Sequence, residues 1–449
     1  METRIYAPTA ILGYGFPKES LELALLEEPD IIAVDAGSTD PGPYYLGEGV
    51  PFVTDSMLYR DLTLLIEASY KHEIPLAIGT AGGAGAKPHV DKTLAIIKRI
   101  LNKKGYKARI AVVYSDVNKQ KLIELLKQRK HFSLGRNNPL GDLTEERIRE
   151  STRIVAQLGV EPIMKALEEE PDIIVAGRVV DVAVFAALPW IKKQHKGLAV
   201  HLGKVLECGA IAAEPGSGSD GMMGVLRNGE FEVYPVNPSR RATVLSVAEH
   251  ALYERTDPFR EYVPGGYADL SQATYEEAGD GHVVVKGTGW VDLEERYVKL
   301  EGARLAGHRY VVVAGVRDPL FISRREELVD KAIEAVKERI HGEYNIYVHF
   351  YGANAVMGYR EPNPVPGHEL GIIIEVVSRD KELAKTIAGA VRSTLLHLGW
   401  PGRITTAGNL ALPFSPSDLY AGKAYEWSIW HLIEEHDPLE FSFIRVLEV

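Results

Sequence analysis

The feature that most constrains the fold is a series of apolar segments that each lead directly into a glycine-rich or acidic turn. Short apolar runs bounded by turn residues are typical of buried strands. Amphipathic stretches at 20–28, 91–104, 117–130 and 145–158 follow or separate them and predict helices. Strands that alternate with helices predict an α/β fold with a doubly wound, mostly parallel sheet. The five segments are AILGYGFP (10–17), IIAVDAGSTDPGP (31–43), IPLAIGTAGGAGAKP (74–88), ARIAVVYSD (108–116) and DIIVAGRVVD (172–181).

Composition places the chain among ordinary globular proteins, because 45% of its 449 residues are apolar and 25% are charged. A formal net charge of −11 without a long basic run argues against nucleic-acid binding. We find neither an apolar segment long enough to cross a membrane nor a signal-like beginning, and therefore expect a cytoplasmic protein without a membrane partner. The single cysteine, Cys208, excludes a disulfide within one chain.

The stretch at 214–221 is rich in Gly and Ser, unlike the sequence before it, and predicts a domain boundary near residue 215. We expect residues 1–215 to form the doubly wound domain that carries an acidic site. Hairpin signals mixed with a few helices predict that residues 216–449 form an α+β domain that closes over this site. The apolar tail at 440–449 is expected to end the chain as a strand docked on the sheet.

Acidic residues follow three of the predicted strands, namely Asp35 and Asp40, then Asp116, then Asp181. The carboxyl ends of parallel strands lie along one edge of a sheet, where ligands bind. We therefore expect these carboxylates to converge on divalent cations, since clustered carboxylates otherwise repel one another. The alternative is that Asp35 and Asp40 only form turns or caps. Asp55 is a further candidate ligand, with a helix N-cap as its alternative role.

The loop GTAGGAGAK at 79–87 is rich in small residues and ends in a lysine. Its backbone N–H groups could approach an anion closely, with Thr80, Gly82, Gly83 and Lys87 binding substrate. A tight turn needed only for packing is the alternative. The loop is not a nucleotide-binding phosphate loop, because the residue after the lysine is a proline and not Ser or Thr.

Arg178 and Asp181 are three residues apart at the exit of a predicted strand, where one could bind an anion and the other a cation. A structural Arg–Asp pair is the alternative. Glu207 lies among apolar and small residues, where a carboxylate is costly to bury without a positive partner. Glu214 lies near the same face if the helix that begins at residue 201 continues. Asp116 and Asp220 stay open as ligands.

The phrases DAGSTDPGPYYLG, TAGGAGAKP, AGRVVDVAVFAA and HLGKVLECGA, in this order, resemble the AtuA-like (acyclic terpene utilisation) family, as does YGANAVMGYR at 351–360. The resemblance implies an acidic metal site in a small cavity lined by these stretches. It places Asp35, Asp40, Asp181 and Glu207 on the matching positions.

An all-carboxylate ligand set favours Mn²⁺ or Mg²⁺ over Zn²⁺, and several acids favour more than one ion. The first hypothesis is therefore a metal-dependent phosphatase that hydrolyses small phosphate esters. The second is a metal-dependent hydratase or lyase acting on a small carboxylate or acyl thioester. The third is a non-catalytic metal-binding subunit, and a homo-oligomer is compatible with all three. In the first hypothesis, the metal ligands are Asp35, Asp40, Asp55, Asp181, Glu207 and Glu214, and the catalytic residues are Asp35, Asp181 and Arg178.

Overall fold

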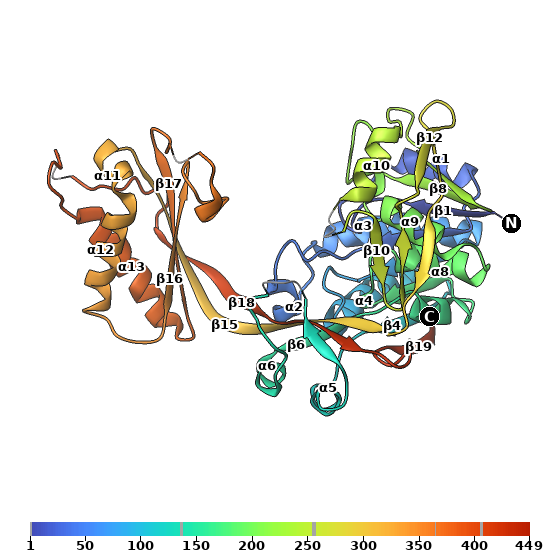
Figure 1. Ribbon diagram of the computed structural model, residues 1–449, viewed down its shortest axis with the longest axis horizontal. Coiled ribbons are helices and arrows are strands. Elements are labelled where there is room, and N and C mark those ends of the chain that lie inside the picture. The colour runs from blue at the N-terminus through green and yellow to red at the C-terminus, as the bar shows by residue number, and fades with distance from the viewer. Residues whose placement is uncertain (1, 135–137, 254–256, 364, 405–406) are drawn as a thin grey trace. The chain divides into compact units, whose positions relative to one another are not determined.

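The computed structural model describes residues 2–134, 138–253, 257–363, 365–404 and 407–449 (Figure 1). The chain divides into two compact units, one of Met1–Arg304 with Trp427–Val449 and the other of Leu305–Glu426. The expected boundary near residue 215 lies inside the first unit. The reason is that β8 (Met222–Arg227) pairs antiparallel with β1 (Thr3–Ala7) and so extends the same sheet.

The first unit is built on a mixed sheet that contains ten strands among the described residues. Five neighbouring strands pair in parallel, and antiparallel strands extend both edges. This confirms a mixed α/β fold. In spatial order the strands are β12 (Thr274–Glu277), β13 (Val283–Lys286), β9 (Glu230–Pro235), β8, β1, β2 (Ile31–Asp35), β3 (Leu76–Gly79), β7 (Ile173–Ala176), β4 (Arg109–Tyr114) and β19 (Phe443–Glu448).

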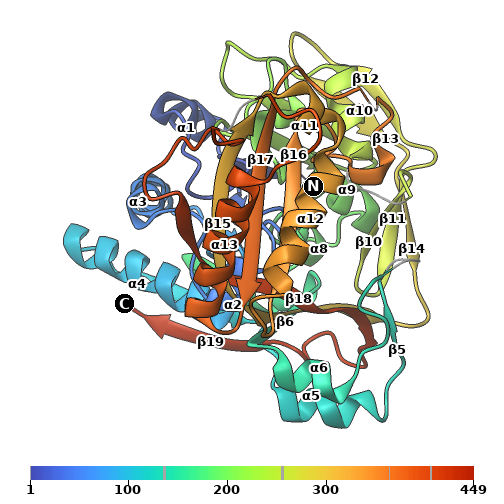
Figure 2. The same ribbon diagram turned by 90° about the vertical axis from the view of Figure 1, so that its left-hand side faces the viewer.

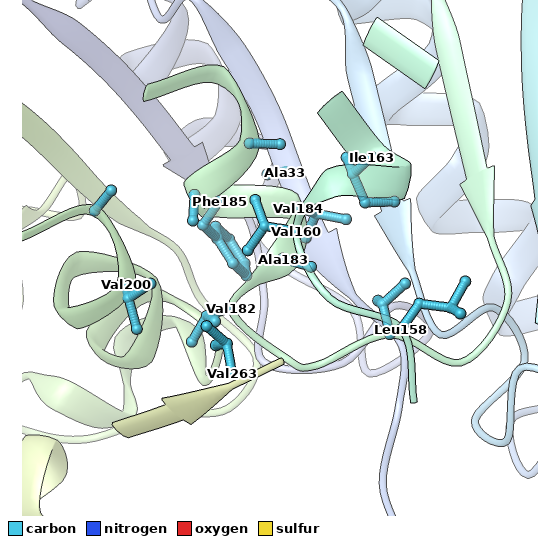
Figure 3. Close-up of a cluster of buried hydrophobic side chains, with 14 of the residues drawn as sticks. Ala33, Leu158, Val160, Ile163, Val182, Ala183, Val184, Phe185, Val200 and Val263 are labelled. Atoms are coloured by element: carbon cyan, nitrogen blue, oxygen red, sulfur yellow. The ribbon is translucent and has the colours of Figure 1, made fainter. Parts of the chain in front are cut away.

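The parallel strands are buried on both faces, which explains their continuous apolar sequences. Alternate residues belong to different cores: Ala33 packs in one cluster, while Ile32 and Val34 pack in another. Figure 3 shows part of the first cluster, with Ala33 and Phe185 drawn as sticks. Helices α1 (Lys18–Leu26), α3 (Asp55–His72) and α4 (Lys87–Lys104) pack in the second cluster. The first cluster takes α5 (Lys119–Leu126), α6 (Glu145–Glu150), α7 (Glu161–Leu167), α8 (Ala183–Ile191), α9 (Lys196–Leu206) and α10 (Val244–Leu252).

The connections of two neighbouring strands leave towards opposite faces of the sheet. Strand β3 leads into α4 on one face of the sheet, whereas its neighbour β7 leads into α8 on the opposite face. Where successive connections leave towards opposite faces, a crevice opens at the carboxyl ends of the strands. Residues that follow β2, β3 and β7 are therefore placed around one position.

The stretch 145–158, expected as one helix, divides into α6 and strand β6 (Arg153–Gln157). Strand β6 pairs with β15 (Tyr297–Val316), and this tertiary pairing overrides the local helical pattern. The tail forms β19 antiparallel to β4, as predicted. The remaining elements of this unit are α2 (Tyr44–Glu48), β5 (His131–Ser133), the 3₁₀ turn η1 (Gly209–Ala212) and a three-stranded sheet of β10 (Arg260–Val263), β11 (Gly266–Asp269) and β14 (Gly289–Asp292).

The second unit has its own hydrophobic core between an antiparallel sheet and helices on one face. The helices α12 (Arg325–Lys337) and α13 (Lys381–His397) lie side by side on β16 (Asn345–Tyr351) and β17 (Leu370–Ser378), as Figure 1 and Figure 2 show. Both boundaries between the units fall inside long strands, β15 and β18 (Asp418–Glu434). The short elements α11 (Pro319–Ser323) and η2 (Gly358–Arg360) complete this unit. No helix in the described ranges is long and apolar enough to cross a membrane.

Candidate functional site

Asp35 is the last residue of β2 and is only 4% exposed. Its Oδ2 accepts a hydrogen bond from the Gly37 N–H at 2.8 Å, whereas its buried Oδ1 has no hydrogen-bond partner among the described residues. A Cβ atom on Gly79, the neighbour of Asp35 on β3, would lie 2.7 Å from Oδ1. Burial, reinforced by the charge of Asp181, raises the pKa of Asp35 to about 7. A glycine therefore makes room for a carboxylate that forms no ion pair among the described residues, although the nearby charge of Arg178 acts to lower its pKa.

Arg178 follows β7 and is 5% exposed. Its Nε and Nη2 donate to the two carboxylate oxygens of Glu301 at 3.1 and 3.3 Å, and its Nη1 donates to Asp181 at 3.2 Å. Although burial alone lowers the pKa of Arg178, the charges of Glu301 and Asp181 raise it. Burial acts to raise the pKa of Glu301, but the charges of Arg178 and Lys299 lower it to about 2. Arg178 is thus a permanent cation, held between a buried and a half-exposed carboxylate.

Glu207 directly follows α9 and is 5% exposed. Lys204, one turn earlier, donates to its Oε1 at 2.5 Å. The other oxygen, Oε2, is buried and has no hydrogen-bond partner in the part of the chain that the structure describes. Burial raises the pKa of Glu207 well above its usual range, and the charge of Asp181 adds to this against the opposing charge of Lys204.

These side chains share one cavity of about 250 Å³. Three of its acids come from different turns, and Asp181 repels both Asp35 and Glu207, which shows that all three lie within electrostatic range. The structure therefore brings together four predicted ligands, with Arg178 as the basic residue of the lining. The cavity is lined by Ala10, Ile11, Tyr14, Asp35, Gly37, Ser38, Thr39, Asp40, Arg178, Asp181, Glu207, Cys208, Ile211 and Tyr253.

Asp40 lines the cavity from an exposed turn in which its N–H donates to Ser38 Oγ at 3.2 Å. Asp40 therefore both forms a turn and lines the cavity. Asp55 lies elsewhere, as the exposed first residue of α3, where it pairs with Lys92 at 2.6 Å. The N-cap of α3 is Thr54 and not Asp55, so the N-cap role predicted as the alternative for Asp55 belongs to the preceding residue.

Glu214 also lies outside this cavity. Helix α9 ends at Leu206, so no continuous helix carries Glu214 to the face of Glu207. Its Oε1 accepts from Thr243 Oγ1 at 2.8 Å, and it lines a separate cavity of about 640 Å³. The two acids whose ligand role stayed open are also elsewhere. Asp116 is exposed and absent from the lining, and Asp220 is fully buried beside Arg240 at 2.8 Å.

The glycine loop after β3 uses its backbone for internal contacts. The N–H groups of residues 81, 83 and 85 donate to the carbonyls of residues 176, 80 and 81. A Cβ on Gly83 would lie 2.0 Å from Phe52, and one on Gly82 would lie 2.8 Å from His89. The Thr80 hydroxyl contacts the backbone of Val179. These contacts favour the packing role over an anion cradle.

Lys87 begins α4 and is absent from the lining of the cavity. Its ammonium group forms an ion pair with Asp91 and lies over the ring of Tyr114. It is therefore occupied on the surface of the helix.

A second group of donors adjoins the same cavity. One carboxylate oxygen of Glu207, Cys208 Sγ and one ring nitrogen of His250 lie within 4.8 Å of one another. Of these three residues, only Glu207 was predicted as a ligand from the sequence, where Cys208 served only to exclude a disulfide. His250 was missed, because it comes from α10 about forty residues later and resembles an ordinary position in an amphipathic helix. Glu301 was also missed, because it lies inside a strand pattern far from Arg178.

The donors around the cavity fit a divalent cation. Two carboxylates, Asp35 and Glu207, each leave a buried oxygen without a donor in the described part of the chain. Buried carboxylates need a compensating positive charge. Lys204 supplies one to Glu207, whereas Asp35 has no ion pair among the described residues and Arg178 is already shared by Glu301 and Asp181. A cation bound to these oxygens would supply the missing charge.

Comparison with known proteins identifies the family of the chain. Searches of curated proteins and of solved structures returned no match to the chain. The family model described as acyclic terpene utilisation family protein AtuA matches residues 55–409, which is most of the chain. The protein is therefore a member of the AtuA family.

Proposed function

We propose that this protein is a hydrolase of small phosphate esters that depends on Mn²⁺ or Mg²⁺. The observation that carries the proposal is a pair of buried carboxylates in one small cavity, Asp35 and Glu207, each with an oxygen that lacks a hydrogen-bond partner among the described residues. Asp35, Asp40, Asp181 and Glu207 would hold the metal.

The donor chemistry supports this choice of ion. Carboxylate oxygens are hard ligands that suit Mn²⁺ and Mg²⁺, and four of them can hold more than one ion. The position also agrees with the proposal, because ligands of doubly wound sheets bind at the carboxyl ends of strands such as β2 and β7. We accordingly interpret the parallel core as a doubly wound sheet.

The residues of the chain have separable roles in this proposal. Arg178, fixed by Glu301, points one permanent cation at the cavity and would orient an anionic group of the substrate. Asp181 would hold both Arg178 and the metal. The cavity of about 250 Å³ suits a small ester. When bound, the divalent cation supplies positive charge for phosphate oxygens and lowers the pKa of a water molecule.

A second candidate is a metal-dependent hydratase or lyase acting on a small carboxylate or acyl thioester. One observation favours it: the glycine loop and Lys87 are engaged in internal contacts, so neither presents a ready phosphate cradle. In such a reaction the cation would polarise a carbonyl group, and an acidic side chain would move a proton.

The two candidates separate in a phosphate-release assay. Chelator-stripped protein is incubated with a panel of small phosphate esters after Mn²⁺, Mg²⁺, Ca²⁺, Zn²⁺ or no metal is restored. We expect turnover with Mn²⁺ or Mg²⁺ that is lost in Asp35→Asn and kept in Asp55→Asn, since Asp55 lies on the surface beside Lys92. Protein that binds Mn²⁺ but releases no phosphate from any ester would contradict the phosphatase proposal. The panel would then move to hydration and elimination of small acids, and inertness there too would leave a metal-binding subunit.

A further inference from the structure

A second group of donors adjoins the cavity and includes a sulfur and an imidazole nitrogen, unlike the carboxylates after β2 and β7. Glu207, Cys208 and His250 bring one carboxylate oxygen, one sulfur and one imidazole nitrogen within 4.8 Å of one another. The first two follow the end of α9, and the third comes from α10, which packs against α9. Two separate segments are therefore folded so that three metal-ligating atoms meet.

The carboxylate of this group has one oxygen held and one available. Lys204 donates to Glu207 Oε1 at 2.5 Å, which fixes the side chain. Glu207 Oε2 lacks a hydrogen-bond partner among the described residues, and it is also shielded from water, because the whole side chain is only 5% exposed. A buried oxygen without a donor is costly, and a cation is the partner that would remove this cost.

We propose that Glu207, Cys208 and His250 form a site for a thiophilic first-row metal ion, with Zn²⁺ as the best fit. Thiolate and imidazole select Zn²⁺ over Mg²⁺ or Mn²⁺. Three protein ligands leave the fourth position of a tetrahedral ion for water or substrate, which is the arrangement of catalytic zinc sites. Glu207 and Cys208 line the 250 Å³ cavity, so an ion held by them would lie beside the space where substrate would bind.

This inference goes beyond the proposed phosphatase reaction and does not depend on it. Glu207 belongs to both donor sets. The hard set, with Asp35, Asp40 and Asp181, lines the cavity, and the soft end at Cys208 and His250 adjoins it through Cys208. Binding at the soft end converts the Cys208 thiol to a thiolate, and the released proton passes to the solvent.

Cobalt titration tests the soft end by a signal that activity does not influence. Co²⁺ replaces Zn²⁺ in such sites, and a Co²⁺–thiolate bond gives an intense near-ultraviolet absorption band. Since Cys208 is the single cysteine of the chain, any such band comes from this residue. We expect one equivalent of Co²⁺ to produce the band in chelator-stripped, reduced, full-length protein, and Zn²⁺ to displace it.

Variants assign the ligands. Cys208→Ser should abolish the band. His250→Gln should weaken Co²⁺ binding by more than about tenfold, because replacing even a residue that only hydrogen-bonds to a metal ligand lowers metal affinity by about tenfold or more. His282→Gln is the control, because this half-exposed histidine pairs with Glu232 outside the cavity. Circular dichroism establishes that each variant is folded. Zn²⁺ should also slow the reaction of the wild-type thiol with a disulfide reagent.

Two outcomes would overturn the inference. One is the absence of the Co²⁺–thiolate band in wild-type protein, and the other is that the His250→Gln variant binds Co²⁺ with the same affinity as wild type. Both are separable from the phosphatase proposal. A cobalt band without phosphate release contradicts only the reaction, whereas Mn²⁺-dependent phosphate release without a cobalt band contradicts only the soft site.

Discussion

Replacing Glu301 by glutamine tests whether Arg178 depends on a buried partner. Glu301 and Arg178 have side chains that are 3% and 5% exposed, and the two groups form two N–H···O hydrogen bonds. Glutamine keeps the shape of the side chain but removes its charge, which leaves Arg178 with the half-exposed Asp181. Breaking a buried ion pair from one side costs about 3–5 kcal/mol of unfolding free energy.

The pKa of Glu301 gives a second route to the same magnitude. Its pKa falls from 4.5 to about 2 in the folded protein. At about 1.4 kcal/mol per unit, this difference corresponds to about 3 kcal/mol of stability. Because the folded pKa is the lower one, this stability is present above pH 4.5 and is lost as the pH falls towards 2. The Glu301→Gln variant should therefore be much less stable than wild type at pH 7, and the gap should shrink in acid.

Denaturant unfolding followed by tryptophan fluorescence measures this difference. Four of the five tryptophans lie in the first unit, which also contains Glu301, so the signal reports mainly on that unit. Glu145→Gln is the control, because Glu145 pairs with Arg149 on the exposed surface of the same unit. A loss in Glu301→Gln no greater than the loss in Glu145→Gln would refute the role assigned to this ion pair.

Two further predictions concern Asp35. Burial and the charge of Asp181 raise its folded pKa to about 7, so ionised Asp35 destabilises the metal-free protein. Asp35→Asn should raise the melting temperature of chelator-stripped protein, more at pH 8 than at pH 5; an equal or opposite effect at pH 8 would contradict this. Gly79→Ala would place a Cβ 2.7 Å from Asp35 Oδ1, so Mn²⁺ affinity should fall by at least about tenfold. Gly289→Ala is the control, because its Cβ would lie 3.5 Å from Asp269, an ordinary contact, and should leave the Mn²⁺ affinity unchanged. Equal Mn²⁺ affinities in the two variants would contradict the prediction that a Cβ at position 79 displaces the Asp35 carboxylate.

The central part of the fold was predictable from sequence, because its strands are buried on both faces and therefore appear as continuous apolar runs. The same reasoning identified Asp35, Arg178 and Asp181 as neighbours of one sheet edge. Glu207 was predicted as a candidate ligand from its neighbours in the sequence, because apolar surroundings make an unpaired carboxylate costly to bury. The predictions for Asp35, Arg178 and Asp181 needed only the strand pattern and the rule for parallel sheets.

The domain boundary was not predictable in the same way. The Gly- and Ser-rich stretch at 214–221 has the composition of a linker, but β8 follows it and returns to β1 in the first sheet. Pairing between strands more than two hundred residues apart has no local signal. The long strands β15 and β18, where the units actually meet along the chain, have ordinary strand sequences.

The missed site residues have the same physical origin. Glu301 reaches Arg178 across a separation of 123 residues, and His250 reaches Glu207 from a different helix. Each conforms to the pattern of the element that carries it, so nothing nearby marks it. Glu214 shows the opposite case, because a local helical spacing suggested a shared face that the end of α9 removes.

Calorimetric titration of Mn²⁺ into chelator-stripped protein tests the central claim most directly. The buried oxygens of Asp35 and Glu207 predict that wild-type protein and the surface variant Asp55→Asn bind Mn²⁺ with equal affinity. They also predict that Asp35→Asn weakens binding by more than about tenfold. Binding of equal strength in Asp35→Asn, or none in folded wild-type protein, would contradict a metal site at the end of β2.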